Sequence, residues 1–450
     1  MSLFAPRLAP ADRARRHREL GLMLFAALIT VAAYTLVALG RTSTLPGDIV
    51  PFLGQMVLLL VVAHLATRRF AALADGTLLP IAALLNGIGY VVIARLSARL
   101  ALLQATWTLV GIGAYIVTLV VVRQVQTLAR LKWTALLSAV VLLLLPFVPF
   151  IGRNINGSHI WIRVSWLSIQ PGELAKIALA VFLAAYLTER RDLLANATWR
   201  VGPLRLPEPR HLGPLLLAWL LSIAVMVGQR DLGSSLLLFG LFVTLVWVAT
   251  GRASYPAIAG GLFAAGAYAA YRLRFGQVHD RVAIWLDPWS RAQGKGYQLV
   301  QSAFAFATGG VSGTGLGLGN PGRIPEAKND FIFAAIGEEL GLLGTTAILV
   351  AFLLLIGSGL RIAVRAQRPF EKLLATGLTT IVGLQAFVII GGVIRVVPLT
   401  GVTLPFVSYG GSSLVANYIL LALLVRISDE TARRTPTSIV THDAVLRDAP

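Results

Sequence analysis

The sequence predicts an all-α integral membrane protein, a bundle of about twelve transmembrane helices. Three observations support this fold class. Hydrophobic residues make up 56% of the 450-residue chain and charged residues only 13%, a composition typical of membrane proteins rather than soluble domains. Apolar runs of roughly the ~20 residues that a bilayer requires recur along the chain. Arg and Lys collect in the short connections between these runs, as they do in membrane proteins of fixed orientation.

The apolar runs give the order of the expected helices. They lie at 21–39, 49–67, 77–95, 103–122, 132–151, 171–188, 211–228, 233–250, 255–271, 339–359, 374–395 and 409–426. A long extracytoplasmic loop precedes the tenth span. The span at 255–271 is rich in Gly and Ala, and without it every later segment would change sides.

Basic residues predict the orientation of the bundle. Those of the N-terminal stretch and of four later connections fall on one side, at 13–18, 68–69, 123–132, 190–210 and 361–372. Because such residues favour the cytoplasm, both termini are expected there, in the bacterial plasma membrane. The first apolar run is too long for a signal-peptide core, so we interpret it as a retained span.

The composition also argues against several classes of function. The net charge of +19 is dispersed and nowhere forms a basic patch interleaved with aromatics, so no nucleic-acid partner is expected. The absence of cysteine excludes a disulfide framework, a thiolate nucleophile and a cysteine metal site. The six histidines are scattered, without an i, i+4 pair, which argues against a zinc site.

Four regions follow from this pattern. They are a basic cytoplasmic segment at 1–18, N-terminal transmembrane helices at 19–130, a core at 131–427 and a disordered cytoplasmic tail at 428–450. The polar residues of the core gather in three outer segments, at 152–170, 272–338 and 396–408.

Asp330 is the leading candidate for a catalytic residue. It closes the longest outer loop, in IPEAKNDFIFAAIGEELG, and the apolar string FIF follows it directly. A carboxylate at this point could lie in a partly desolvated cleft, where its pKa would rise toward that of a usable base. The alternative is that this run of charges is only a solvated face.

A second group of candidates lies at the start of the sixth span. In QPGELAKI, Pro171 suits the first helical position, and Glu173 and Lys176 share a face. The pair could be an i, i+3 ion pair within the bundle. Alternatively, Lys176 could bind an anionic headgroup, since charge within a membrane is usually kept for function. The turn at 229–231 is interpreted as a tight connection that caps the next helix.

Two outer segments carry further expectations. Residues 297–308 predict a short amphipathic helix, with Phe304 and Phe306 toward lipid or a neighbouring helix. The glycines at 309–319 fit a flexible loop better than a phosphate loop, because their spacing matches no phosphate-binding fingerprint. The last outer segment is either a plain re-entry turn or, at membrane depth, a loop that lines a polar cavity.

Five strings resemble the shape, elongation, division and sporulation (SEDS) family, which includes RodA, FtsW and SpoVE. They are, in order, NGSHIWIRVSWLSIQPGELAKI, QRDLGSSL, GYQLVQSAFAFATGG, IPEAKNDFIFAAIGEELGLLG and TGVTLPFVSYGGSSL. The resemblance covers about 150–427. It implies an inverting glycosyltransferase that polymerises glycan strands from lipid II, releases undecaprenyl pyrophosphate and works beside a class B penicillin-binding transpeptidase.

The resemblance also implies roles for single residues. Asp330 matches the family's essential outer aspartate and is expected to act as general base. Expected substrate-binding residues are Lys176, which matches the lysine of the first motif, and Glu326, Gln301 and Ser408, which match motif positions. The chemistry adds Arg281, with Lys176, as a contact for the departing pyrophosphate, and a divalent cation (Mg²⁺ or Mn²⁺) as a further helper.

The chain departs from the family pattern at three motif positions. It has Gly172 in place of serine, Arg230 in place of proline, and Thr400 where division-type members tend to carry lysine; the last favours a role in elongation. Two extra N-terminal helices have no role that the sequence reveals. Three alternatives stay open: a lipid II flippase, which predicts charges near the midplane, a division-type polymerase, and a scaffold without activity.

Overall fold

The structure is a computed structural model. It describes residues 10–434 apart from 45–46, 48, 156–157, 165–166, 196–198, 202–203, 207–208, 230 and 274–275. The N-terminal segment to residue 9 and the end of the expected tail, 435–450, therefore lie outside the described residues, as does Arg230.

A helix coincides with each expected span, which confirms an all-α membrane protein. These helices are α1 (Pro10–Thr42), α2 (Ile49–Phe70), α3 (Leu78–Leu96), α4 (Ala98–Val121), α6 (Lys132–Leu144), α7 (Gly172–Ala195), α8 (Pro209–Gly228), α9 (Leu232–Thr250), α10 (Ser254–Arg272), α13 (Ile332–Arg365), α14 (Pro369–Val393) and α15 (Gly411–Arg434). Within the described ranges, 8 of them are long and apolar enough to cross a membrane. The exact number of spans stays a prediction.

Two boundaries differ from the expected ones. Helix α13 begins at Ile332 rather than 339, because Phe331 to Phe333 are buried and draw the chain into the bundle. Helix α15 continues to Arg434, with Asp429 and Glu430 buried against the bundle, so a disordered tail from residue 428 is wrong for 428–434. Polar residues extend this helix because Arg426 and Arg434 pair with them.

Two small sheets were not expected from the sequence. Strands β1 (Gly152–Ile155), β2 (Ser158–Val164) and β3 (Leu167–Ile169) form an antiparallel sheet before α7, and β4 (Trp199–Val201) pairs with β5 (Leu204–Leu206) before α8. The alternating string SHIWIRV of β2 carries the period of a strand. It is too short to be distinguished from the surrounding apolar runs by composition.

The long outer loop folds into short helices. After α11 (Gly276–Leu286) and η2 (Trp289–Arg291), the expected amphipathic helix appears as α12 (Tyr297–Gly309). Phe304 is exposed on it, whereas Phe306 packs against Phe333 of α13, with 6.1 Å between the ring centroids. The remaining short elements are α5 (Gln126–Arg130), η1 (Leu145–Phe147) and η3 (Pro321–Arg323).

The glycine-rich segment 309–319 is not a flexible loop, and that expectation is wrong. Its backbone amides bond to α13, where Thr314 N donates to Glu338 O and Gly315 N to Glu339 O, both at 3.0 Å. The contact is possible because α13 is kinked at Gly341, whose φ of 63° is left-handed. A Cβ at Gly341 would lie 2.3 Å from the amide nitrogen of Gly313.

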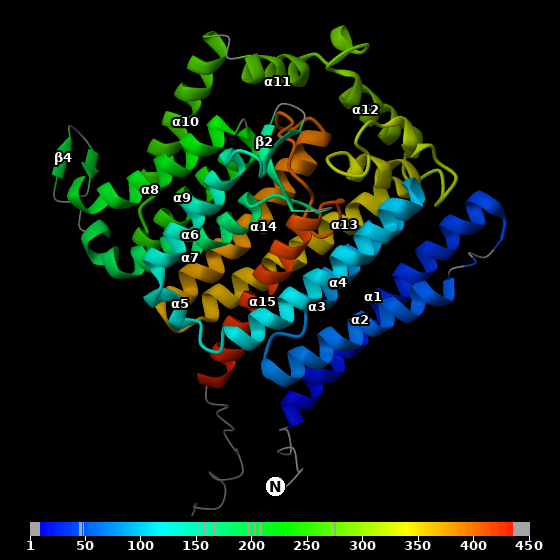
Figure 1. The fold of residues 1–450 in the computed structure, drawn as a ribbon, viewed down its shortest axis with the longest axis horizontal. Helices are drawn as coiled ribbons and strands as arrows, with labels where there is room; N and C mark the ends of the chain where they lie inside the picture. The colour runs from blue at the N-terminus through cyan, green and yellow to red at the C-terminus, as the bar shows by residue number, and fades with distance from the viewer. Residues whose placement is uncertain are drawn as a thin grey trace, which may run out of the picture.

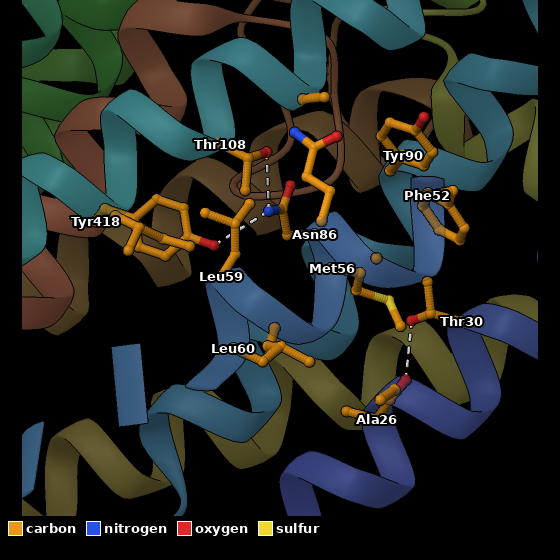
Figure 2. Close-up of a pocket in the computed structure, with 16 residues that line it drawn as sticks. Ala26, Thr30, Phe52, Met56, Leu59, Leu60, Asn86, Tyr90, Thr108 and Tyr418 are labelled. Carbon is orange, nitrogen blue, oxygen red and sulfur yellow. Dashed lines mark hydrogen bonds between the residues drawn. The ribbon is translucent and has the colours of Figure 1, made fainter. Parts of the chain in front are cut away.

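The two extra N-terminal helices pack on one flank of the core. In Figure 1, α1 and α2 lie beside α3 and α4, and α1 makes its main contacts with α3. Between them lies an apolar cavity of about 70 Å³, where Asn86 donates to Thr108 at 3.2 Å and to Tyr418 at 3.1 Å (Figure 2). This volume holds roughly two water molecules.

The bundle has two distinct ends. In Figure 1, α11, α12 and β2 lie at the upper end, and the described ends of α1 and α15 lie at the lower end. Helix α13 runs between the ends and begins at the upper one (Figure 1), and Asp330 precedes its first residue, Ile332, by two positions. The three outer segments predicted from the sequence thus meet at the end that holds Asp330.

Candidate active site

Buried apolar residues fix the position of Asp330. Phe331, Ile332 and Phe333 are at most 2% exposed, so the first turn of α13 is anchored inside the bundle. Asp330 itself is partly buried. On the other side of its carboxylate lies Gly401, where a Cβ would be 3.6 Å from Oδ2 of Asp330. The buried residues that follow Asp330 therefore hold its backbone in a fixed position.

The loop between α14 and α15 holds the segment that carries Asp330. Ser408 donates its hydroxyl to Asn329 O at 2.6 Å and accepts from Leu404 N at 2.9 Å, and Tyr409 N donates to Lys328 O at 2.8 Å. Ser408 is itself buried. Its hydroxyl is used within the protein, so the structure gives Ser408 a positioning role, and its expected contact with substrate stays a prediction.

This loop enters the bundle, as the cavity-lining alternative requires. Val402, Leu404, Phe406 and Val407 are at most 5% exposed, and Gln385 of α14 donates to Thr403 O at 2.9 Å. Backbone polar groups at membrane depth need such partners. The segment is therefore a buried wall of the site rather than a plain turn.

Arg281 is the cation of the site. Its guanidinium donates to Thr400 O at 3.0 Å, which ties α11 to the loop between α14 and α15. Burial lowers the pKa of Arg281, while the nearby carboxylates of Asp231 and Asp330 raise it. Arg281 thus stands between two acidic groups, close enough to interact with both.

The surroundings of Asp330 favour its protonated form. Burial is the largest cause and the negative charge of Glu326 is the second; the opposing effect of Arg281 is smaller, so the pKa of Asp330 rises to about 7. A carboxyl group with this pKa can accept a proton near neutral pH and is a stronger base than an ordinary aspartate. The sequence-based expectation for Asp330 agrees with this geometry.

Asp231 belongs to the site, although the sequence indicated only a helix cap. It does cap α9, because its carboxylate accepts from Ser234 N at 2.9 Å. It also acts electrostatically on Arg281. The spacing of the two residues in the sequence could not reveal this interaction, because Asp231 and Arg281 lie far apart along the chain and approach each other only in the fold. The one sequence signal for a functional role of Asp231 was its place in QRDLGSSL, a string that resembles a family motif.

Lys176 forms an ion pair with a neighbour on its own helix, and its expected contact with the substrate stays a prediction. Its ammonium lies 2.9 Å from Oε2 of Glu173, and the two side chains are 1% and 5% exposed. The structure therefore shows the i, i+3 ion pair that the sequence left as one alternative. Buried in this pair, Lys176 supports the helix start at the wall of the bundle, and the cation near Asp330 is Arg281.

Glu326 and Gln301 occupy different places. Glu326 is exposed at the rim, with a left-handed φ of 57°, and accepts from Asn329 at 2.6 Å. Gln301 of α12 lines a separate cleft of about 610 Å³ that also includes Thr314, Arg323 and Glu338. Glu326 therefore lies near Asp330 and tunes it, whereas no contact joins Gln301 to Asp330 among the described residues.

The site offers few groups for a metal ion. In the part of the chain that the structure describes, no three His, Cys, Asp or Glu side chains gather as a metal cage would require. Two polar atoms of the site are buried without a hydrogen-bond partner, Oγ1 of Thr400 and Oδ1 of Asn329. Such atoms are uncommon in folded proteins, and here both can accept from a hydroxyl group.

Comparisons with known proteins point to one family. A family model described as cell cycle protein, built on FtsW, RodA and SpoVE, matches residues 76–433. The peptidoglycan glycosyltransferase RodA of Mycobacterium tuberculosis is 46% identical over 437 residues, 95% of this chain and 93% of that protein. The RodA of Mycobacterium leprae is 44% identical over 431 residues, 94% of this chain and 92% of that protein.

Solved structures share the fold. A structure described as the structural coordination of polymerization and crosslinking by a peptidoglycan synthase complex superposes with a TM-score of 0.66 at 26% identity, over 80% of this chain and 98% of that one. The crystal structure of the Thermus thermophilus rod shape determining protein RodA gives a TM-score of 0.56 at 24% identity, over 79% and 96% of the two chains.

Proposed function

The chain belongs to the FtsW, RodA and SpoVE family of cell cycle proteins, and from this premise we propose a peptidoglycan glycosyltransferase of the RodA type. Its curated relatives of 44 to 46% identity are peptidoglycan glycosyltransferases. The enzyme polymerises glycan strands in a membrane. We propose lipid II as its substrate and undecaprenyl pyrophosphate as its leaving group, with cell wall elongation and cell shape as its role.

The observation that carries the mechanism is the carboxylate of Asp330 with a pKa near 7 beside the guanidinium of Arg281. Chain growth joins the sugar 4-hydroxyl of one lipid-linked saccharide to the anomeric carbon of another. The new C–O bond forms as the bond from that carbon to the pyrophosphate oxygen breaks, with inversion at the carbon. Asp330 accepts the hydroxyl proton, and the electron pair of the broken bond leaves with the pyrophosphate.

Positive charge near the pyrophosphate assists its departure. We assign this role to Arg281, because its guanidinium is fixed to Thr400 O yet lies within electrostatic reach of Asp330. Lys176 would contribute indirectly, by supporting the start of α7. A Mg²⁺ or Mn²⁺ ion, where the reaction uses one, would be held mainly by the pyrophosphate oxygens, since no three acidic or histidine side chains gather as a cage among the described residues.

The partner follows from the same family membership. One structural neighbour is part of a peptidoglycan synthase complex that coordinates polymerization and crosslinking. We therefore propose that this chain works beside a class B penicillin-binding transpeptidase, which would crosslink the strand that the glycosyltransferase extends. Thr400 supports the elongation role over a division role, since division-type members tend to carry lysine there.

The assignment of Asp330 is tested by polymerisation of lipid II in reconstituted vesicles. Asp330→Asn keeps the size of the side chain but cannot accept the proton, so the rate should fall about 100-fold or more. Asp287→Asn is the matched control, because Asp287 is exposed in the same outer loop and caps the turn at Ser290, a bond that asparagine can also make. An Asp330→Asn protein as active as Asp287→Asn would remove the base assignment.

The same vesicles separate the polymerase from the flippase and the scaffold. Glycan product formed without any other polymerase supports the enzyme. Movement of lipid II across the bilayer without product would favour the flippase, and neither activity would favour the scaffold. The charged groups near Asp330 lie at one end of the bundle, not at its midplane, which favours the polymerase.

A further inference from the structure

A basic cleft lies at the end of the bundle opposite Asp330. Its volume is about 640 Å³, within the range of ligand-binding pockets. The residues that line it come from the ends of α2, α4 and α15 and the start of α14. Six of them are arginines: Arg69, Arg123, Arg368, Arg426, Arg433 and Arg434.

Helix α13 lies between the basic cleft and the active site, and its length shows how far apart they are. The part of this helix after its kink at Gly341 runs to Arg365, and at 1.5 Å per residue it alone separates the two sites by about 36 Å. The cleft therefore cannot hold groups that react at Asp330. It must be explained separately from the glycosyltransferase reaction.

Three of the arginines at the cleft are neutralised within the protein. Arg434 pairs with Glu371 at 2.6 Å and with Glu430 at 2.7 Å, and Arg433 pairs with Asp429 at 2.8 Å. Arg426 also lies 3.6 Å from Asp429 and donates to Phe70 O at 2.6 Å, at the end of α2. These three arginines face three carboxylates, so this floor of the cleft has no net charge.

The other three arginines retain their charge. Arg69, Arg123 and Arg368 are exposed and form no ion pair with any described residue. They come from three separate elements, the last turn of α2, the connection after α4 and the residue before α14. The cleft therefore has three arginines whose charge no described carboxylate balances, beside three arginines that are paired with carboxylates.

The chemistry of this arrangement fits a phosphate group. Arginine is suited to phosphate recognition because its planar guanidinium donates several hydrogen bonds at once. The cleft lies at the ends of helices that are long and apolar enough to cross a membrane, and basic pockets between such helices on the cytoplasmic side bind anionic lipids. The positive residues at this end also predict that it faces the cytoplasm.

We propose that Arg69, Arg123 and Arg368 form a binding site for a phosphate-bearing ligand, the headgroup of an anionic phospholipid in the leaflet opposite the active site. The neutral floor gives the site a fixed shape, because its ion pairs hold the ends of α14 and α15 together. The three outer arginines supply the charge. A zwitterionic headgroup, which has no net charge, should bind far more weakly.

The test is a lipid titration of the full-length purified protein, read by native mass spectrometry. The probes are cardiolipin, phosphatidylglycerol, phosphatidylcholine and, separately, inorganic phosphate. Replacing Arg69, Arg123 and Arg368 together by Gln should weaken cardiolipin binding at least tenfold, and replacing them by Lys should weaken it less than threefold. Phosphatidylcholine binding should not change.

The matched control is Arg361→Gln with Arg365→Gln. Both residues are exposed on the last turns of α13, at the same end of the bundle, and neither lines the cleft. This control removes surface charge without touching the site, so cardiolipin binding should change less than twofold. The single variant Arg123→Gln serves if the triple variant fails to fold, with an expected loss of at least twofold.

The outcomes separate the sources of the phosphate. Loss of cardiolipin binding in the Gln variants alone supports the lipid site. Inorganic phosphate that binds with the same dependence on the three arginines, while no lipid does, supports the phosphate site with a soluble ligand. Equal cardiolipin binding in the triple Gln variant and the native protein, or an equal loss in the control, overturns the proposal.

Discussion

Asp330 combines two properties that a base needs, a fixed position and a raised proton affinity. The position comes from buried Phe331 and Phe333 and from Ser408, which holds the preceding carbonyl. The proton affinity comes from burial and from the negative charge of Glu326, which together raise the pKa of Asp330 more than the positive charge of Arg281 lowers it. The charges of Glu326 and Arg281 can each be removed by a single substitution, so their effects on the pKa of Asp330 can be tested through the pH dependence of the rate.

The value of kcat/KM should rise as the pH increases through about 7, because Asp330 then loses its proton and only the ionised carboxylate can accept one. Arg281 favours the ionised form, so Arg281→Gln should move this rise to higher pH. Glu326 disfavours it, so Glu326→Gln should move the rise to lower pH. The measurement is the initial rate of lipid II polymerisation at low substrate between pH 5 and 9.

Arg281→Lys is the control for this prediction, because it keeps the positive charge while altering the shape of the side chain. Its pH profile should lie closer to that of the native protein than the profile of Arg281→Gln does. Shifts of Arg281→Gln and Glu326→Gln in the same direction would contradict the electrostatic account, since the two charges have opposite signs.

At the residue scale, the sequence identified Asp330 because the motif and the apolar string FIF are local signals. It did not identify the electrostatic influence of Asp231 on Arg281, since the two residues are distant in sequence and approach each other only through the fold. Lys176 was correctly given an ion pair as one alternative. Its expected contact with the pyrophosphate stays a prediction.

At the element scale, α1 braces the outer glycine-rich segment. A Cβ at Gly40 would lie 2.4 Å from Leu316 O, and one at Gly317 would lie 2.5 Å from Val37 O. The backbones of the two segments therefore meet with no side chain between them. This contact gives the extra N-terminal helices a structural role, because the braced segment also lines the cleft that contains Gln301.

Gly40→Val should separate α1 from this segment and destabilise the protein, with a fall in melting temperature and a partial loss of polymerisation. Gly21→Val is the control, since Gly21 lies in the same helix with nothing within 4 Å of its Cβ position. The measurement is thermal unfolding of both variants in detergent. Equal melting temperatures for the two variants would show that the contact contributes no stability.

The elements themselves were largely predictable, because a span of apolar residues is a strong local signal. The kink of α13 was not, since Gly341 matters only through its contact with Gly313. The same holds for the extension of α15 to Arg434, which depends on pairing with Glu371 of α14. The β1 to β3 sheet pairs strands that are neighbours in the sequence, but these strands are too short to give a clear signal. The sequence thus predicts where the helices lie better than where they bend or end.

At the scale of the whole molecule, charge divides the bundle into two ends. One end holds Asp330 with Arg281, and the other holds the basic cleft at Arg69, Arg123 and Arg368. The proposed orientation places the first end outside, where a lipid-linked saccharide is presented, and the second in the cytoplasm. This division requires α10 to cross the membrane, although α10 is not among the helices apolar enough to qualify on composition alone.

The absence of cysteine makes this orientation directly testable, because a single introduced cysteine is the only thiol in the chain. Ala253 and Lys295 are exposed on either side of α10 and the following α11. If α10 crosses, a membrane-impermeant maleimide added to intact cells should label Lys295→Cys and not Ala253→Cys. Both should be labelled after the membrane is opened. Labelling of neither in intact cells would place both ends of α10 in the cytoplasm and reverse the orientation of every later helix, including the side on which Asp330 acts.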